Sequence, residues 1–89
     1  MSNTTKQIAV LGSTGSIGKQ ALQVITDYPD RFSVYALTAN NNIDLLIKQA
    51  RKFQPEIAII ANENHFLQLK EALSDLPIKV FAGEESIAQ

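Results

Sequence analysis

Short runs rich in apolar residues alternate with longer amphipathic segments along this chain. The runs contain Val, Ile, Phe and Tyr, which favour strands, and they lie at 7–11, 32–37, 57–60 and 78–81. Between them, apolar residues recur every three or four positions, which is the spacing of one face of a helix. The pattern therefore predicts three helices between four strands, in the order β-α-β-α-β-α-β.

Each predicted helix carries an apolar stripe that is expected to face a sheet. In the first helix the stripe consists of Ile17, Ala21, Val24, Ile25 and Tyr28. In the second helix it consists of Ile43, Leu46, Ile47, Ala50 and Phe53. In the third helix it consists of Phe66, Leu69, Leu73 and Leu76. These stripes are the expected source of the hydrophobic core.

Prolines and asparagines mark the ends of the predicted helices. Pro29 ends the first helix and Pro55 follows the second, because proline cannot continue a helical hydrogen-bond ladder. Asn42 is expected to cap the second helix, with Asp44 in its first turn, where the helix dipole favours a negative charge. Asn62 is expected to cap the third helix.

Strict alternation of strands and helices predicts an α/β fold, a Rossmann-like doubly wound parallel sheet with right-handed crossovers and helices on both faces. In a Rossmann arrangement the first and fourth strands are expected to be neighbours. Segment 83–89 has the character of a turn and the beginning of another helix. We therefore expect residues 1–89 to be the N-terminal part of a dinucleotide-binding domain, truncated after the fourth strand. Its open sheet edge is expected to pair with another copy.

Three of the four glycines fall within seven residues, at the predicted turn between the first strand and the first helix. In a dinucleotide-binding turn the first glycine permits a bend, the second lets the backbone approach a pyrophosphate, and the third lets the helix pack closely. Hydroxyl groups and the free N–H groups of a helix start can bind phosphate oxygens. The candidate cofactor contacts in this turn are Gly12, Ser13, Thr14, Gly15, Ser16, Ile17 and Gly18. A tight turn without a ligand is the alternative.

A second candidate segment follows the second predicted strand. In NAD-specific folds a carboxylate about 20 residues after the glycines binds the ribose 2′-hydroxyl. Here the segment consists of Ala39, Asn40, Asn41 and Asn42, and the first acid is Asp44. A carboxylate in this segment would repel a 2′-phosphate. Because the segment contains none, it favours NADPH over NADH. The alternative is that these asparagines only cap a helix.

Three stretches resemble one enzyme family: IAVLGSTGSIG at 8–18, YPDRFSVYAL at 28–37 and FQPEIA at 53–58. They closely resemble the opening part of the 1-deoxy-D-xylulose 5-phosphate reductoisomerases, NADPH-dependent enzymes of non-mevalonate isoprenoid biosynthesis. The resemblance covers essentially all 89 residues, but only the first part of a much longer family chain.

The resemblance implies conversion of 1-deoxy-D-xylulose 5-phosphate to 2-C-methyl-D-erythritol 4-phosphate, with NADPH as hydride donor and Mg²⁺ or Mn²⁺ as the divalent cation. It implies that segment 14–17 contacts the cofactor's pyrophosphate and that segment 39–42 holds the ribose and its 2′-phosphate. The family's catalytic residues and metal ligands lie beyond Gln89. No catalytic or metal-binding residue is therefore expected within this chain, and the piece alone is expected to be inactive.

Two positions depart from the family's pattern. Asn40 stands where the family usually has glycine, and Asn41 stands where it often has lysine or arginine. Asparagine accepts left-handed backbone better than most residues, so the turn is expected to survive. Loss of the cation is expected to weaken the grip on the 2′-phosphate.

Charge and composition limit the partners. The net charge is −1, and the eight basic residues are spread along the chain, so neither a nucleic-acid surface nor a basic membrane-binding cluster is expected. The absence of cysteine excludes disulfides and cysteine-based zinc sites. Segment 1–6 is polar and lacks the apolar core of a signal peptide. We expect a cytoplasmic protein with a small-molecule substrate that forms a homodimer.

Two other functions are also compatible with the sequence. One is a different NADP-dependent dehydrogenase of the aspartate-semialdehyde or homoserine type, although the segments around Pro29 and Pro55 argue against it. The other is a non-catalytic dinucleotide-binding regulatory module that ends near Gln89.

Overall fold

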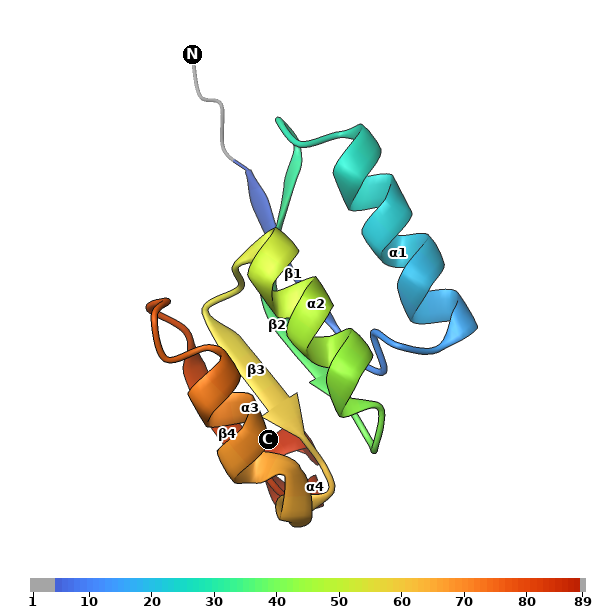
Figure 1. The fold of residues 1–89 in the computed structure, drawn as a ribbon. Coiled ribbons are helices and arrows are strands. Elements are labelled where there is room, and N and C mark those ends of the chain that lie inside the picture. The colour runs from blue at the N-terminus through green and yellow to red at the C-terminus, as the bar shows by residue number, and fades with distance from the viewer. Residues whose placement is uncertain (1–4, 89) are drawn as a thin grey trace.

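Four parallel strands form one sheet in the order β1-β2-β3-β4 (Figure 1). They are β1 (Lys6–Val10), β2 (Phe32–Ala39), β3 (Ile57–Ile60) and β4 (Lys79–Ala82). The computed structural model describes residues 5–88, and the polar segment 1–4 lies outside them. The parallel α/β class and the predicted alternation of strands and helices are confirmed.

The connections between the strands are helical. They are α1 (Ser16–Asp27), α2 (Ile43–Phe53), the 3-10 turn η1 (Glu63–His65) and α3 (Phe66–Ala72), and α4 (Glu84–Ala88) follows β4. Asn42 caps α2 as predicted, because its side-chain oxygen accepts a hydrogen bond from the Leu45 N–H at 3.2 Å. Asn62 instead caps η1, accepting from the Asn64 N–H at 3.0 Å, so α3 begins later and is shorter than its apolar pattern suggests.

The prediction that the first and fourth strands are adjacent in the sheet is wrong. Strand β1 pairs only with β2 and β4 pairs only with β3 among residues 5–88, so β1 and β4 lie at opposite edges of the sheet. Within residues 5–88, each new strand is added on the same side of the previous one, and the strand order does not reverse. The alternation of strands and helices does not determine which edge of the sheet a new strand joins, because this depends on tertiary contacts.

Helices α1, α2 and α3 cover the same face of the sheet (Figure 1). With right-handed crossovers, a strand order that never reverses places every connecting helix on one side. These three helices thus lie on one face of the four described strands, and the Rossmann-like α/β fold that the sequence predicts is confirmed. One core cluster results, formed by helix residues together with alternate strand residues, among them Leu37, Leu46, Ile60 and Leu69.

The stripe predicted for the first helix is displaced. The buried residues of α1 are Gly18, Leu22 and Ile25, whereas Ile17 is 82% exposed and Val24 is 49% exposed. The inner face of α1 is centred on Gly18. Glycine has no side chain, so it was not counted among the apolar positions that predicted the buried face.

Strand β1 is less buried than its apolar sequence predicts. Val10 is its one buried residue, and Ala9 is exposed. Among residues 5–88, β1 pairs with β2 alone, and α1, α2 and α3 leave its second face uncovered (Figure 1). Among the helices of the described part, none combines the length and the apolar character needed to cross a bilayer.

Candidate functional site

The turn that joins β1 to α1 bends at Gly12, which has a positive φ of 69°. This left-handed conformation is readily available to glycine and costly for residues with a β-carbon. The predicted role of the first glycine, a sharp bend directly after the strand, is confirmed. The bend carries the chain from the carboxyl end of β1 across to the start of α1.

The third glycine lets α1 approach the turn closely. A β-carbon on Gly18 would overlap the carbonyl oxygen of Gly12 and would lie 2.6 Å from the Cα of Ser13. These atoms belong to the backbone and cannot move aside as a flexible side chain could. The predicted role of Gly18 in close helix packing is confirmed, although its contact is with the turn rather than with the strand.

The second glycine, Gly15, is the N-cap of α1 and has extended backbone angles, with φ −83° and ψ 175°. A β-carbon there would lie 3.5 Å from the Gly12 oxygen, which is ordinary contact. The protein fold itself thus has no steric need for glycine at this position. The absence of a side chain instead leaves open space outside the turn, next to the start of the helix.

Several backbone N–H groups at this turn have no protein acceptor. Within residues 5–88, those of Thr14, Ser16, Ile17 and Gly18 donate no hydrogen bond, whereas the Gly15 N–H donates to the Gly12 oxygen at 3.0 Å. Unpaired N–H groups in the first turn of a helix, together with its dipole, attract anions. The geometry suits a phosphate group.

Ser13 differs from its neighbours in the turn. It is fully buried, its hydroxyl donates to Gln49 Oε1 at 2.7 Å, and its N–H donates to the Thr38 oxygen at 2.8 Å. Both donors are therefore used inside the protein, so the expected phosphate contact of the Ser13 hydroxyl is not supported. Ser16, by contrast, is exposed, and Thr14 is half-buried.

Segment 39–42 follows β2 and lies beside the turn. Two hydrogen bonds join the strand end to the turn: the Gly12 N–H donates to Thr38 Oγ1 at 2.9 Å, and the Ser13 N–H donates to the Thr38 oxygen. The carboxyl ends of β1 and β2 therefore bring the two predicted segments together. Ligands of open parallel sheets bind at this edge.

The residues of segment 39–42 are placed differently from one another. Ala39 is buried in the core, and its carbonyl oxygen accepts from the Ala61 N–H at 2.8 Å. Asn40, Asn41 and Asn42 are exposed, and Asn41 Oδ1 accepts from the Asn62 amide at 2.9 Å. Within residues 5–88, Gln54 is the single non-glycine residue with a positive φ, so Asn40 adopts no conformation that requires glycine.

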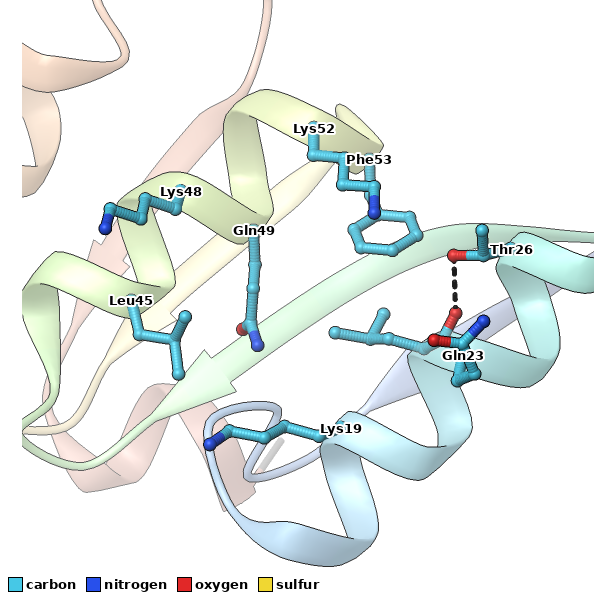
Figure 2. Close-up of a pocket in the computed structure, with 9 residues that line it drawn as sticks. Lys19, Gln23, Thr26, Leu45, Lys48, Gln49, Lys52 and Phe53 are labelled. Atoms are coloured by element: carbon cyan, nitrogen blue, oxygen red, sulfur yellow. Dashed lines mark hydrogen bonds between the residues drawn. The ribbon is translucent and has the colours of Figure 1, made fainter.

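A groove of about 260 Å³ separates α1 from α2 (Figure 2). Lys19, Lys48 and Lys52 line it, and the side chain of Gln49 reaches from α2 down toward the turn that precedes α1. Gln49 is buried, and sequence reasoning missed it. The available signal was its position in the apolar pattern, three residues after Leu46 and next to Ala50, where a polar side chain is unusual.

Residues 5–88 contain no group of three or more His, Asp or Glu side chains arranged to hold a metal ion. The acidic pair Glu84 and Glu85 lies in the first turn of α4, which follows β4. The candidate site is thus built mainly from backbone groups and amides.

Comparison with known proteins shows that this sequence is similar to one protein family. The family model described as 1-deoxy-D-xylulose 5-phosphate reductoisomerase matches residues 8–89. Over 84 residues the chain is 69% identical to the 1-deoxy-D-xylulose 5-phosphate reductoisomerase of Phocaeicola vulgatus, a match that covers 94% of this chain and 22% of that protein.

Solved structures agree with this match. The 1-deoxy-D-xylulose 5-phosphate reductoisomerase from Zymomonas mobilis in complex with NADPH is 37% identical, with a TM-score of 0.89 over 94% of this chain and 22% of that chain. DOX-P reductoisomerase in complex with NADPH, fosmidomycin and magnesium is 31% identical, with a TM-score of 0.86 over 92% of this chain and 20% of that chain. The chain spans about a fifth of the length of the relatives that it matches.

Proposed function

Because the chain belongs to the 1-deoxy-D-xylulose 5-phosphate reductoisomerase family, we propose that it binds NADPH at the turn between β1 and α1. The observation that carries this proposal is the row of unpaired N–H groups at the start of α1, next to a glycine whose missing side chain leaves room for a ligand. Such a helix start binds the pyrophosphate of a dinucleotide.

The proposed pyrophosphate contacts are the backbone groups of segment 14–18 and the hydroxyls of Thr14 and Ser16. Gly12 and Ser13 contribute by shaping the turn, because their N–H groups are already bonded to Thr38. Segment 39–42 is the proposed site of the adenosine ribose and its 2′-phosphate. There the exposed amides of Asn40 and Asn41 offer donors without a repelling carboxylate.

For the protein as a whole we propose the family's reaction, conversion of 1-deoxy-D-xylulose 5-phosphate to 2-C-methyl-D-erythritol 4-phosphate in non-mevalonate isoprenoid biosynthesis. NADPH supplies the hydride when bound, and a divalent cation, Mg²⁺ or Mn²⁺, polarises the substrate carbonyl. The part played by residues 5–88 is to bind and orient the cofactor. We assign no catalytic or metal-binding residue among them.

Residues 1–89 are proposed to form the N-terminal part of the NADPH-binding domain, in keeping with the share of the relatives that they span. A homodimer in the cytoplasm completes the proposal. A dehydrogenase of the semialdehyde or homoserine type is set aside, because the family model and the relatives belong to a different family.

The test uses the product of the complete reading frame in which this sequence lies. It is incubated with NADPH, Mg²⁺ and 1-deoxy-D-xylulose 5-phosphate, and the loss of NADPH absorbance is followed together with the formation of product. Turnover that requires all three components supports the proposal. NADPH binding without turnover would favour the regulatory module, and the absence of NADPH binding would refute the proposed function.

A further inference from the structure

Three buried polar residues meet beneath the glycine turn. Ser13 is fully buried, Thr38 is 3% exposed and Gln49 is 8% exposed. A buried polar group is costly unless it is hydrogen-bonded, and every buried side-chain nitrogen and oxygen among the described residues has a partner. This cluster, which we call the sub-turn network, joins β2 and α2 to the turn.

At the centre of the sub-turn network, Gln49 and Ser13 form a reciprocal pair. The Ser13 hydroxyl donates to Gln49 Oε1 at 2.7 Å, and Gln49 Nε2 donates to the Ser13 carbonyl oxygen at 2.9 Å. Both ends of the amide are thus bonded to one residue that lies 36 positions away in the sequence. Two bonds from one planar group fix the backbone of Ser13 in position as well as in orientation.

Thr38 holds the other side of the turn. Its hydroxyl oxygen accepts from the Gly12 N–H, and its carbonyl oxygen accepts from the Ser13 N–H. The N–H groups and the carbonyl oxygens of Gly12 and Ser13 are therefore all bonded within the protein. Within residues 5–88, the N–H groups of Thr14, Ser16, Ile17 and Gly18 donate to no protein acceptor and remain available to a ligand.

We infer that Gln49 is a positioning residue for the cofactor: through its reciprocal hydrogen bonds with Ser13, it holds the glycine turn in the shape that binds the pyrophosphate. Gln49 acts through Ser13 because its own amide is buried and already bonded. Its side chain extends from α2 toward the turn (Figure 2). The inference rests on the proposed binding of NADPH at this turn.

Gln49 could also influence cofactor binding through α2 and the asparagine segment, instead of through Ser13 and the glycine turn. Asn42, which caps α2 and is the last residue of the proposed 2′-phosphate segment 39–42, lies seven residues before Gln49, about two turns along the same helix. If Gln49 acts on the turn, it affects the pyrophosphate, which NADPH and NADH share. If it acts on the asparagine segment, it affects the 2′-phosphate, which only NADPH carries.

The experiment compares the product of the complete reading frame with its Gln49→Leu variant, which loses both bonds to Ser13 at similar size. The Kd values of NADPH and NADH are measured by cofactor fluorescence. We expect both to rise by the same factor, about tenfold, from the loss of two buried hydrogen bonds. In the double variant with Ser13→Ala, no further rise is expected, because the two residues act as a unit.

Two controls separate positioning from general destabilisation. Gln68→Leu makes the same chemical change on the exposed face of α3, and Leu73→Val removes buried volume from the core beneath α3. Both are expected to leave the Kd of NADPH unchanged, although Leu73→Val lowers the melting temperature. Gln49→Met keeps the length of glutamine and also loses both bonds to Ser13, so the same rise in the Kd of NADPH and NADH is expected. It supplies the test if Gln49→Leu does not fold.

Several outcomes overturn the inference. Unchanged Kd values in a folded Gln49 variant contradict it, as does a rise confined to NADPH, which points to the asparagine segment. A comparable rise in Leu73→Val would mean that stability alone is responsible. If the unsubstituted protein itself binds no NADPH, the proposed function fails together with the inference, and that result is distinguishable from the others.

Discussion

Gly18 and Gly12 are in direct contact: the Cα of Gly18, in the first turn of α1, lies so close to the Gly12 carbonyl oxygen that a β-carbon would overlap it. Gly12 in turn holds the left-handed backbone that ends β1. One glycine therefore bends the chain, and the other lets the helix return against the bend. This contact brings the first N–H groups of α1 to the carboxyl edge of the sheet.

Replacement of Gly18 by alanine tests the contact. The added methyl group has to displace backbone atoms of Gly12 and Ser13. We therefore expect Gly18→Ala to lower the free energy of unfolding by about 1 to 3 kcal/mol or more. Urea denaturation, followed by circular dichroism, measures the change. A variant as stable as the unsubstituted protein would show that the helix sits farther from the turn than described.

Gly15→Ala is the matched variant three residues earlier. Its β-carbon would make only ordinary contact with the Gly12 oxygen, and its backbone angles are open to alanine. Stability should change little, because the restriction that alanine places on the unfolded chain is offset by its poorer fit at the N-cap. Affinity for NADPH should fall, since the methyl group occupies the space proposed for the pyrophosphate. Titration of NADPH fluorescence measures the affinity, and an unchanged Kd would remove Gly15 from the proposed site.

Asn41 tests the proposed 2′-phosphate segment. Asn41→Lys introduces a cation at an exposed position of this segment. We expect about threefold to fivefold tighter binding of NADPH, the range of a solvent-exposed charge pair, and no change for NADH. Asn41→Gln, which is neutral, serves as the control. Equal effects on both cofactors would place the 2′-phosphate elsewhere.

An ion pair predicts a pH dependence of stability. Arg51 on α2 donates two hydrogen bonds to the Asp75 carboxylate, at 2.8 and 2.9 Å, and these lower the pKa of Asp75 from 3.8 to about 2. A carboxyl whose pKa is depressed on folding stabilises the protein above its unfolded pKa and loses that contribution as the pH falls through the folded value. The pair is exposed, so the effect is small.

The expected result is a slightly lower urea midpoint for Asp75→Asn than for the unsubstituted protein at pH 7. That difference should disappear between about pH 4 and pH 2, where the native carboxylate takes up its proton. High salt should reduce the difference at pH 7 as well, because both side chains are exposed to solvent. A difference that persists at the lowest pH would assign the effect to something other than the charge of Asp75.

Local features of this fold could be read from the sequence. The bounds of β3 match the prediction, because an uninterrupted run of Ile and Ala follows Pro55. Asn42 caps α2 as expected, since capping depends on a few neighbouring residues. Gly12 was placed correctly at the bend for the same reason. These features are determined within a few residues of chain.

Features set by contacts between distant segments could not be read in this way. The face that α1 buries is determined by Gly18, whose importance lies in the side chain that it lacks. The role of Gln49 depends on Ser13, which lies 36 residues away. The order of the strands depends on the edge that each crossover selects, for which no residue in the chain gives a local signal. Sequence reasoning therefore located the candidate site but not its support.

The most direct test of the account is a titration of the ¹⁵N-labelled product of the complete reading frame with NADPH, followed by NMR of the backbone amides. We expect saturable shifts that are largest at Ser16, Ile17 and Gly18, with further shifts in segment 39–42. Saturable shifts confined to the groove between α1 and α2, or the absence of shifts at the start of α1, would contradict it.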